Sequence, residues 1–178
     1  NRVHHILRAV VEDDPDTGKC VVGRGGFPNE KGILECDAAI MDGNGCRFGA
    51  VAAVQGVATP FSVARLVMER SKHSILVSEG AQQFAKEHGI SVLNNELLQT
   101  ESSTKAYKEF LKTKEKSCVH TTCGHDTIGV LVKDFQGNIA AGTSTSGKPF
   151  KSSGRVGDSP LPGAGLYADN EVHNISDL

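Results

Sequence analysis

Apolar and polar residues follow a strand-like pattern in two parts of this chain. Residues 128–133 and 139–144 are apolar or small over the length of a strand, and a short loop containing glycine separates them. This arrangement is typical of a β-hairpin. Residues 37–41 and 47–54 repeat the pattern around a turn at residues 42–45. The sequence therefore predicts two hairpins.

Helical periodicity lies between and before these strands. Thr59 and Pro60 combine a capping residue with proline at the first helical position, and apolar residues at helical spacing follow them. Further helices are predicted over residues 3–11, after a capping residue at Ser78 with a stop at Gly89, and from Thr104, with a short strand at residues 74–77. Amphipathic helices beside hairpins predict an α+β fold in which helices cover a sheet.

Composition favours one globular domain. The chain has 178 residues, of which 38% are hydrophobic and 22% charged, within the ordinary range for folded domains. The formal charge of -2 and the lack of a basic stripe argue against nucleic acid as a partner. No apolar run reaches the roughly 18 residues that span a bilayer, so we expect no membrane partner. The five cysteines do not settle the compartment, although Cys118 and Cys123 are near enough in sequence to pair.

The hairpin over residues 128–144 places two threonines near each other. Thr127 precedes its first strand and Thr145 follows its second. A threonine hydroxyl needs a base to become a nucleophile, and the residue's own α-amine, with a pKa of about 8, can serve. Because the nitrogen of Thr127 is an amide within the chain, this chemistry requires scission of the Asp126–Thr127 bond.

Successive motifs around these threonines resemble the glycosylasparaginase (aspartylglucosaminidase) family of N-terminal nucleophile hydrolases. The main motifs are HDTIG at 125–129, AGTST at 141–145, GRVGDSP at 154–160, PGAG at 162–165 and YAD at 167–169. Weaker matches upstream are VGRGG at 22–26 with PN at 28–29, DAAIMDG at 37–43 and VAR at 63–65. Together they follow the family's order over nearly the whole chain.

The resemblance implies a role for individual residues. Thr127 is similar to the nucleophile that attacks the carbonyl of Asp126 and is released by autoproteolysis, and Thr145 to the residue that hydrogen-bonds it. Arg155 resembles the clamp on the substrate's α-carboxylate, and Asp158 the partner of its α-ammonium. The family hydrolyses the bond between N-acetylglucosamine and asparagine without a cofactor or a metal. A small glycoasparagine is then the expected substrate.

The resemblance also implies an architecture. We expect a four-layer αββα sandwich, incomplete at both ends, in a single partial domain over residues 1–178. Residues 1–126 would form the α-subunit-like part and residues 127–178 the start of the β-subunit-like part. The cleaved parts are expected to form a heterodimer that pairs further, in the lysosome or in a secreted or periplasmic setting.

Other interpretations remain at this stage. An L-asparaginase or β-aspartyl peptidase of the same superfamily would share the nucleophile and the clamp. An inactive shortened isoform is a third reading, because the family's Thr-Gly oxyanion pair is missing after the PGAG motif. In a structural interpretation without catalysis, Thr127 is an ordinary strand threonine, and Arg155 and Asp158 form a weak ion pair on the surface. A competing zinc site would use four closely spaced ligands, Cys118, His120, Cys123 and His125.

Overall fold

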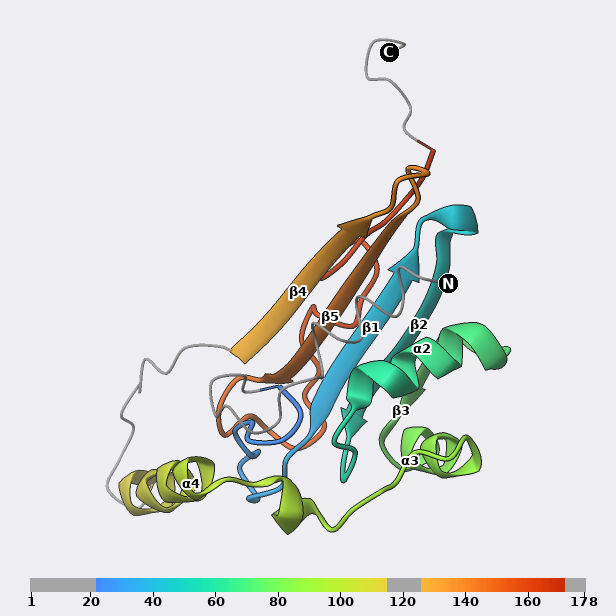
Figure 1. The fold of residues 1–178 in the computed structure, drawn as a ribbon. Coiled ribbons are helices and arrows are strands. Elements are labelled where there is room, and N and C mark those ends of the chain that lie inside the picture. The colour runs from blue at the N-terminus through green and yellow to red at the C-terminus, as the bar shows by residue number, and fades with distance from the viewer. Residues whose placement is uncertain (1–21, 115–125, 172–178) are drawn as a thin grey trace.

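A mixed five-stranded sheet is the framework of the molecule (Figure 1). The computed structural model describes residues 22–114 and 126–171. The strands lie in the order β3-β2-β1-β5-β4. Their bounds are β1 Cys36–Asp42, β2 Arg47–Val54, β3 Ile75–Val77, β4 Asp126–Lys133 and β5 Ile139–Gly147.

Both predicted hairpins are confirmed. β1 pairs with β2, and β4 pairs with β5, each in antiparallel register. β1 also pairs with β5 over six residue pairs, from Asp37↔Thr145 to Asp42↔Ala140. The two hairpins therefore lie side by side in one sheet, and β5 is an inner strand while β4 is an edge strand (Figure 1).

Two of the described helices, α2 (Pro60–Arg70) and α3 (Ser78–Glu87), pack on one face of this sheet. α2 contacts β1 and β2, and α3 contacts β2 and β3. Phe61, Val63 and Val67 of α2 are completely buried in the core between these layers. The α+β fold predicted from the sequence is confirmed: in the described residues it consists of one sheet with helices against one face. The predicted helix over residues 3–11 lies outside the described residues.

The predicted helix starts need small corrections. α2 begins at Pro60 with Thr59 as its N-cap, as predicted, although the Thr59 side chain makes no capping hydrogen bond. Ser78 was predicted to be a cap, but it is the first residue of α3, and Val77 is the cap. α4 (Glu101–Lys114) begins three residues before the predicted Thr104.

The early start of α4 has a local cause. The hydroxyl of Thr100 accepts a hydrogen bond from the Ser103 amide at 3.3 Å, and the hydroxyl of Ser103 accepts one from the Thr100 amide at 3.0 Å. This reciprocal pair has the logic of a capping box, with serine in place of the usual Glu or Gln. It satisfies amides at the helix start that otherwise have no partner within the helix.

An aromatic cluster attaches α4 to the segment after β5. The rings of Phe110 and Phe150 are stacked, with centroids 4.3 Å apart and planes inclined by 11°. The rings of Tyr107 and Phe27 also contact Phe150, each with its centroid 6.1 Å from that of Phe150. Such pairs add stability beyond the area that they bury. The cluster fixes the segment that leads into Lys151.

Alternation along the strands separates the two sheet faces. Cys36, Ala38 and Ile40 of β1 point into the core beneath the helices. Ala39 and Met41 point to the opposite face, where they pack with Leu166 and Ala168 of the C-terminal segment. Thr127, Thr145 and Asp37 are register partners in β4, β5 and β1. The predicted site residues of the strands therefore lie on the face away from the helices.

Candidate active site

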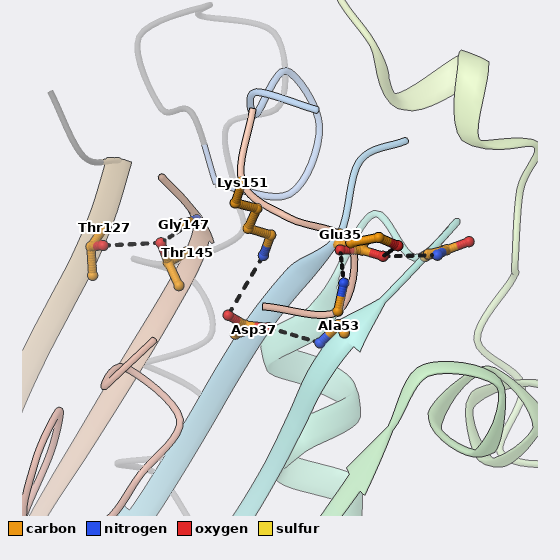
Figure 2. Close-up of polar contacts among 10 residues, drawn as sticks. Glu35, Asp37, Ala53, Thr127, Thr145, Gly147 and Lys151 are labelled. Atoms are coloured by element: carbon orange, nitrogen blue, oxygen red, sulfur yellow. Dashed lines mark hydrogen bonds and ion pairs between the residues drawn. The ribbon is translucent and has the colours of Figure 1, made fainter. Parts of the chain in front are cut away.

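Two threonine hydroxyls are the centre of the site (Figure 2). The hydroxyl of Thr127 donates to the hydroxyl oxygen of Thr145 at 3.0 Å. The amide of Gly147 also donates to that oxygen, at 2.8 Å. Thr145 is buried, with 2% of its surface exposed, whereas Thr127 is exposed. A fixed, buried hydroxyl thus orients an accessible one.

The bond between Asp126 and Thr127 lies at an irregularity of the sheet. Asp126 is opposite Gly147 and Thr127 is opposite Thr145, so Ser146 is an extra residue on β5. β-Bulges of this kind bend a strand and often redirect side chains near active sites. The backbone thus departs from regular pairing at the predicted scission point. His125 and the side chain of Asp126 lie outside the described part of the chain.

The threonine pair borders a cavity of about 380 Å³. This volume is in the range of small-molecule sites. Its lining residues come from β4, β5 and the segment after β5: Thr127, Gly129, Thr143, Thr145, Gly147, Arg155, Gly157, Asp158, Ser159 and Gly165. Small side chains dominate, and they leave the hydroxyl and charged groups accessible to a ligand.

Arg155 and Asp158 line this same cavity. Over the described ranges they form no ion pair with each other, in contrast to the surface-pair interpretation, and both are exposed. A guanidinium group binds carboxylates through two parallel hydrogen bonds, and a carboxylate suits an ammonium group. The structure therefore brings the four residues predicted for catalysis and substrate binding around one cavity, with a cation and an anion beside the hydroxyls.

The loop that carries Asp158 is attached to β5. The hydroxyl of Thr143 donates to the carbonyl oxygen of Ser159 at 2.6 Å, and both residues are buried. Gly165 packs directly against the Asp158 carbonyl, where a larger residue would not fit. These contacts bring the chain back across the open sheet face and hold Asp158 at the cavity.

The sequence reading missed a buried ion pair beside the threonines. Asp37 and Lys151 are 0% and 2% exposed, and their Oδ2 and Nζ atoms are 3.8 Å apart. The other oxygen of Asp37 accepts a hydrogen bond from the Ala53 amide at 2.7 Å (Figure 2). Burial raises the pKa of Asp37, whereas Lys151, the amides of Ala53 and Gly157, and Arg155 lower it. One signal was present: an acidic residue inside an otherwise apolar strand.

A second buried carboxylate contacts the loop before Arg155. Glu35 is 2% exposed. Its oxygens accept hydrogen bonds from the Gly154 amide at 2.9 Å, the Ser153 hydroxyl at 3.3 Å and the Gln55 side chain at 3.1 Å. Nothing in the local sequence distinguished this residue, because its partners are about 20 and 120 positions away.

The described ranges contain neither a candidate metal cluster nor a membrane-spanning helix. No group of three or more His, Cys, Asp or Glu side chains there is arranged to hold a metal ion. The four residues of the alternative zinc site, and the suggested Cys118–Cys123 disulfide, fall outside those ranges. Among the helices of residues 22–114 and 126–171, none combines the length and the apolar character needed to cross a membrane.

A protein-family model and several curated proteins are similar to most of this chain. A family model described as asparaginase matches residues 4–177. A protein named N(4)-(beta-N-acetylglucosaminyl)-L-asparaginase from Elizabethkingia miricola is 45% identical over 163 residues, which are 92% of this chain and 46% of that protein. A Xenopus laevis protein named isoaspartyl peptidase/L-asparaginase is 46% identical over 154 residues, covering 86% of this chain and 50% of that protein.

A human protein with the same name as the Xenopus relative is 43% identical over 168 residues, which are 93% of this chain and 53% of that protein. The chain thus spans about half the length of the curated relatives that it matches. Similarity extends over most of the chain for relatives that carry two different names.

Proposed function

The chain belongs to the asparaginase family, and we propose that it carries the nucleophile and the amino-acid clamp of an amidohydrolase that releases L-aspartate from a substituted asparagine. The family match confirms the resemblance to N-terminal nucleophile hydrolases. One observation carries the proposal: the hydrogen-bonded hydroxyls of Thr127 and Thr145 share a cavity with Arg155 and Asp158. The preferred substrate is N-acetylglucosaminyl-asparagine, the type of amide named for the Elizabethkingia relative.

The first proposed step creates the nucleophile. The Thr127 hydroxyl oxygen adds to the carbonyl carbon of Asp126, and the peptide C–N bond breaks while the nitrogen takes up a proton. Water then hydrolyses the resulting ester, which leaves Asp126 with a carboxylate and Thr127 with a free α-amine. The hydrogen bond to Thr145 and the bulge at this bond support the step, because they orient the hydroxyl at an irregular backbone position.

The second step is substrate turnover. The α-amine accepts the hydroxyl proton as the Thr127 oxygen attacks the side-chain amide carbon of the substrate, and that proton then passes to the leaving nitrogen. An aspartyl ester and a glycosylamine result. Water, activated by the same amine, hydrolyses the ester to L-aspartate and restores the threonine. No cofactor is needed, because the amine supplies both the base and the acid.

Charge complementarity gives the proposed binding mode. Arg155 binds the substrate's α-carboxylate and Asp158 binds its α-ammonium group. This pair recognises the amino-acid head group alone, so it suits glycosylasparagine, asparagine and an isoaspartyl peptide equally. The relatives named isoaspartyl peptidase/L-asparaginase support the second candidate function. The contacts with the leaving group, beyond the clamp, must decide between the two.

We also propose that the two cleaved parts remain assembled as a heterodimer in a four-layer fold. β5, from the part after the scission point, lies between β1 and β4 and pairs with β1 over six positions. Cutting the chain before Thr127 removes none of these pairs. The sheet face opposite the helices leaves Leu131 74% exposed, as expected of a face that a second sheet covers in a sandwich.

Intact mass measured after prolonged incubation tests the first step. We expect two fragments, the second beginning with Thr127, and one uncut mass for the Thr127→Ala variant. Absence of cleavage in both proteins would contradict autoproteolysis. Incubation with glycosylasparagine, asparagine and an isoaspartyl dipeptide then separates the two candidate activities. Exclusive turnover of the dipeptide and asparagine would replace the preferred function with the second one.

A further inference from the structure

We infer that Glu35, Asp37 and Lys151 form a buried support that positions the Arg155 clamp and thereby sets the affinity for the amino-acid head group. This inference rests on the proposed function, in which Arg155 binds the α-carboxylate. None of the three residues lines the cavity. They are positioning residues that act through the loop over residues 153–157.

Strand register places Asp37 beside the reactive threonines. Asp37 is the β1 partner of Thr145, and Thr145 is the β5 partner of Thr127. The three side chains therefore form a row across one face of the sheet, with the nucleophile at the edge and the carboxylate inside (Figure 2). This row connects the nucleophile to the support through neighbouring strands.

Lys151 and Arg155 converge on Gly147. The Nζ atom of Lys151 and the Nη1 atom of Arg155 lie 3.3 Å and 3.1 Å from the point where a side chain on Gly147 would begin. Two cations this near each other repel unless an anion compensates them. Asp37 is that anion, since it forms the ion pair with Lys151 and interacts electrostatically with Arg155. Without its charge, the exposed Arg155 side chain is free to swing away from Lys151 into solvent.

Two carboxylates hold the loop on either side of Arg155. Glu35 accepts a hydrogen bond from the amide of Gly154, the residue immediately before Arg155. Asp37 lies near the amide of Gly157, two residues after it. Asp37 lies near the start of β1 and Glu35 immediately precedes that strand, and both residues are buried. The loop is therefore fixed from beneath at both ends of the segment that presents the guanidinium.

Stability alone is a poor explanation for this cluster. Burying a carboxylate and an ammonium group costs several kcal/mol per ion, and apolar replacements often match or exceed the stability of a buried pair. Here the Lys151–Asp37 distance of 3.8 Å is longer than a good charge-assisted hydrogen bond. In the described residues, Asp37 Oδ2 and Lys151 Nζ have no hydrogen-bond partner. A role in placing the neighbouring cation accounts for charges that contribute little to folding.

The test compares Asp37→Asn with Asp42→Asn in the full chain. Asp42 lies at the other end of β1, is 2% exposed and pairs with Arg47 at 2.6 Å, so it matches Asp37 in burial and in having a cationic partner. L-Aspartate binding is measured by calorimetry, beside β-alanine, which lacks the α-carboxylate. We expect Asp37→Asn to weaken L-aspartate binding by about 10-fold to 100-fold. Binding of β-alanine should change much less, and Asp42→Asn should leave both affinities unchanged.

A second readout does not depend on ligand binding. Phenylglyoxal modifies accessible guanidinium groups, and peptide mass mapping gives the rate at Arg155. We expect Asp37→Asn, and to a smaller extent Glu35→Gln, to increase this rate, while Asp42→Asn does not. Glu35→Gln serves as the test variant if Asp37→Asn does not fold. An unchanged Arg155 rate in the folded test variant overturns the inference.

The two proposals fail in different ways. The proposed clamp is wrong if Arg155→Ala leaves L-aspartate affinity unchanged, or if the parent protein does not bind L-aspartate. In that case the phenylglyoxal modification rates at Arg155 alone decide whether Glu35, Asp37 and Lys151 position its side chain. If Arg155→Ala abolishes binding while Asp37→Asn and Glu35→Gln do not weaken it, the clamp stands and the support is wrong. Equal weakening by Asp37→Asn and Asp42→Asn would indicate a general loss of structure and would also overturn the inference.

Discussion

The two hairpins of this sheet have similar sequence patterns but different environments. Every residue of β1 is buried, and β2 is buried from Gly49 to Val54. In β4, exposed positions such as Thr127, Gly129 and Leu131 alternate with partly buried ones that face the core. The inner hairpin is buried in the core, and the edge hairpin presents Thr127, the proposed nucleophile, to a cavity. The hydroxyl of Thr127 is accessible and still held by a hydrogen bond, because its partner Thr145 belongs to an inner strand.

This contrast predicts that changes at the cavity-lining positions of the edge hairpin affect reactivity, whereas changes at positions in the core affect stability. The Asp37 support connects the two regions, since it originates in the inner hairpin and acts on the loop after the edge hairpin.

The largest effect is expected from removing the hydroxyl of Thr145. Thr145→Val keeps the shape of the side chain but removes the oxygen that accepts hydrogen bonds from the Thr127 hydroxyl and the Gly147 amide. Loss of a group that orients the nucleophile should reduce self-cleavage and turnover by about 10²-fold to 10⁴-fold. Thr145→Ser, which keeps the hydroxyl, should retain most activity. Equal rates for the two variants, measured by mass and by substrate assay, would contradict the orienting role.

The next effect concerns stability in alkaline solution. Burial raises the pKa of the Cys36 thiol from 9.0 to about 12, with the nearby Lys151 opposing the rise. The unfolded chain releases this proton near pH 9.0, while the native chain keeps it until about pH 12, so stability falls as pH rises between these values. The expected slope is about 1.4 kcal/mol per pH unit.

Denaturant unfolding of the reduced protein between pH 8 and pH 11 measures this slope. Cys36→Ala removes the thiol and should lower the slope by the stated amount, whatever it costs at neutral pH. Cys46→Ala is the comparison variant, because Cys46 is an exposed cysteine outside the strands and its removal should lower the slope by less than Cys36→Ala does. A parent protein whose slope equals that of Cys36→Ala would show that the thiol does not contribute to alkaline unfolding.

A smaller effect should follow from crowding the contact between α2 and β2. Gly49 faces the Ala64 carbonyl and the Met68 backbone so closely that a methyl group would overlap them. Gly49→Ala should destabilise the fold by about 1–3 kcal/mol, because the helix must move away from the sheet. Gly80→Ala in α3 meets no atom within 4 Å and should instead stabilise by about 0.4–1 kcal/mol. Thermal unfolding of both variants checks the opposite signs.

The smallest effect compares the two faces of the edge strand. Leu131 is 74% exposed, whereas Val130 packs against the core beneath the helices. In the 178-residue chain, Leu131→Thr should change the unfolding free energy by less than about 0.5 kcal/mol. Val130→Thr places a hydroxyl at a partly buried position and should cost about 1–2 kcal/mol. Equal effects would mean that β4 does not have distinct inner and outer faces.

Strand and helix patterns were readable in the sequence because they depend on local periodicity. The hairpins at residues 36–54 and 126–147 and the start of α2 were predicted from alternation, turn residues and Pro60. The start of α4 was displaced, because the mutual bonds of Thr100 and Ser103 begin the helix earlier than the apolar pattern indicates. Local errors of this size come from capping contacts that compete with periodicity.

The sequence by itself determined the motifs, the alternation that puts Thr127 and Thr145 on one sheet face, and the presence of both a guanidinium and a carboxylate after β5. Only the tertiary structure decided that β5 lies between β1 and β4, and therefore that Asp37 stands next to Thr145. It also decided that Glu35 reaches Gly154, 119 positions away. The physical reason is that periodicity fixes which way a side chain points within its own strand, whereas its neighbour across the sheet depends on how distant segments pack.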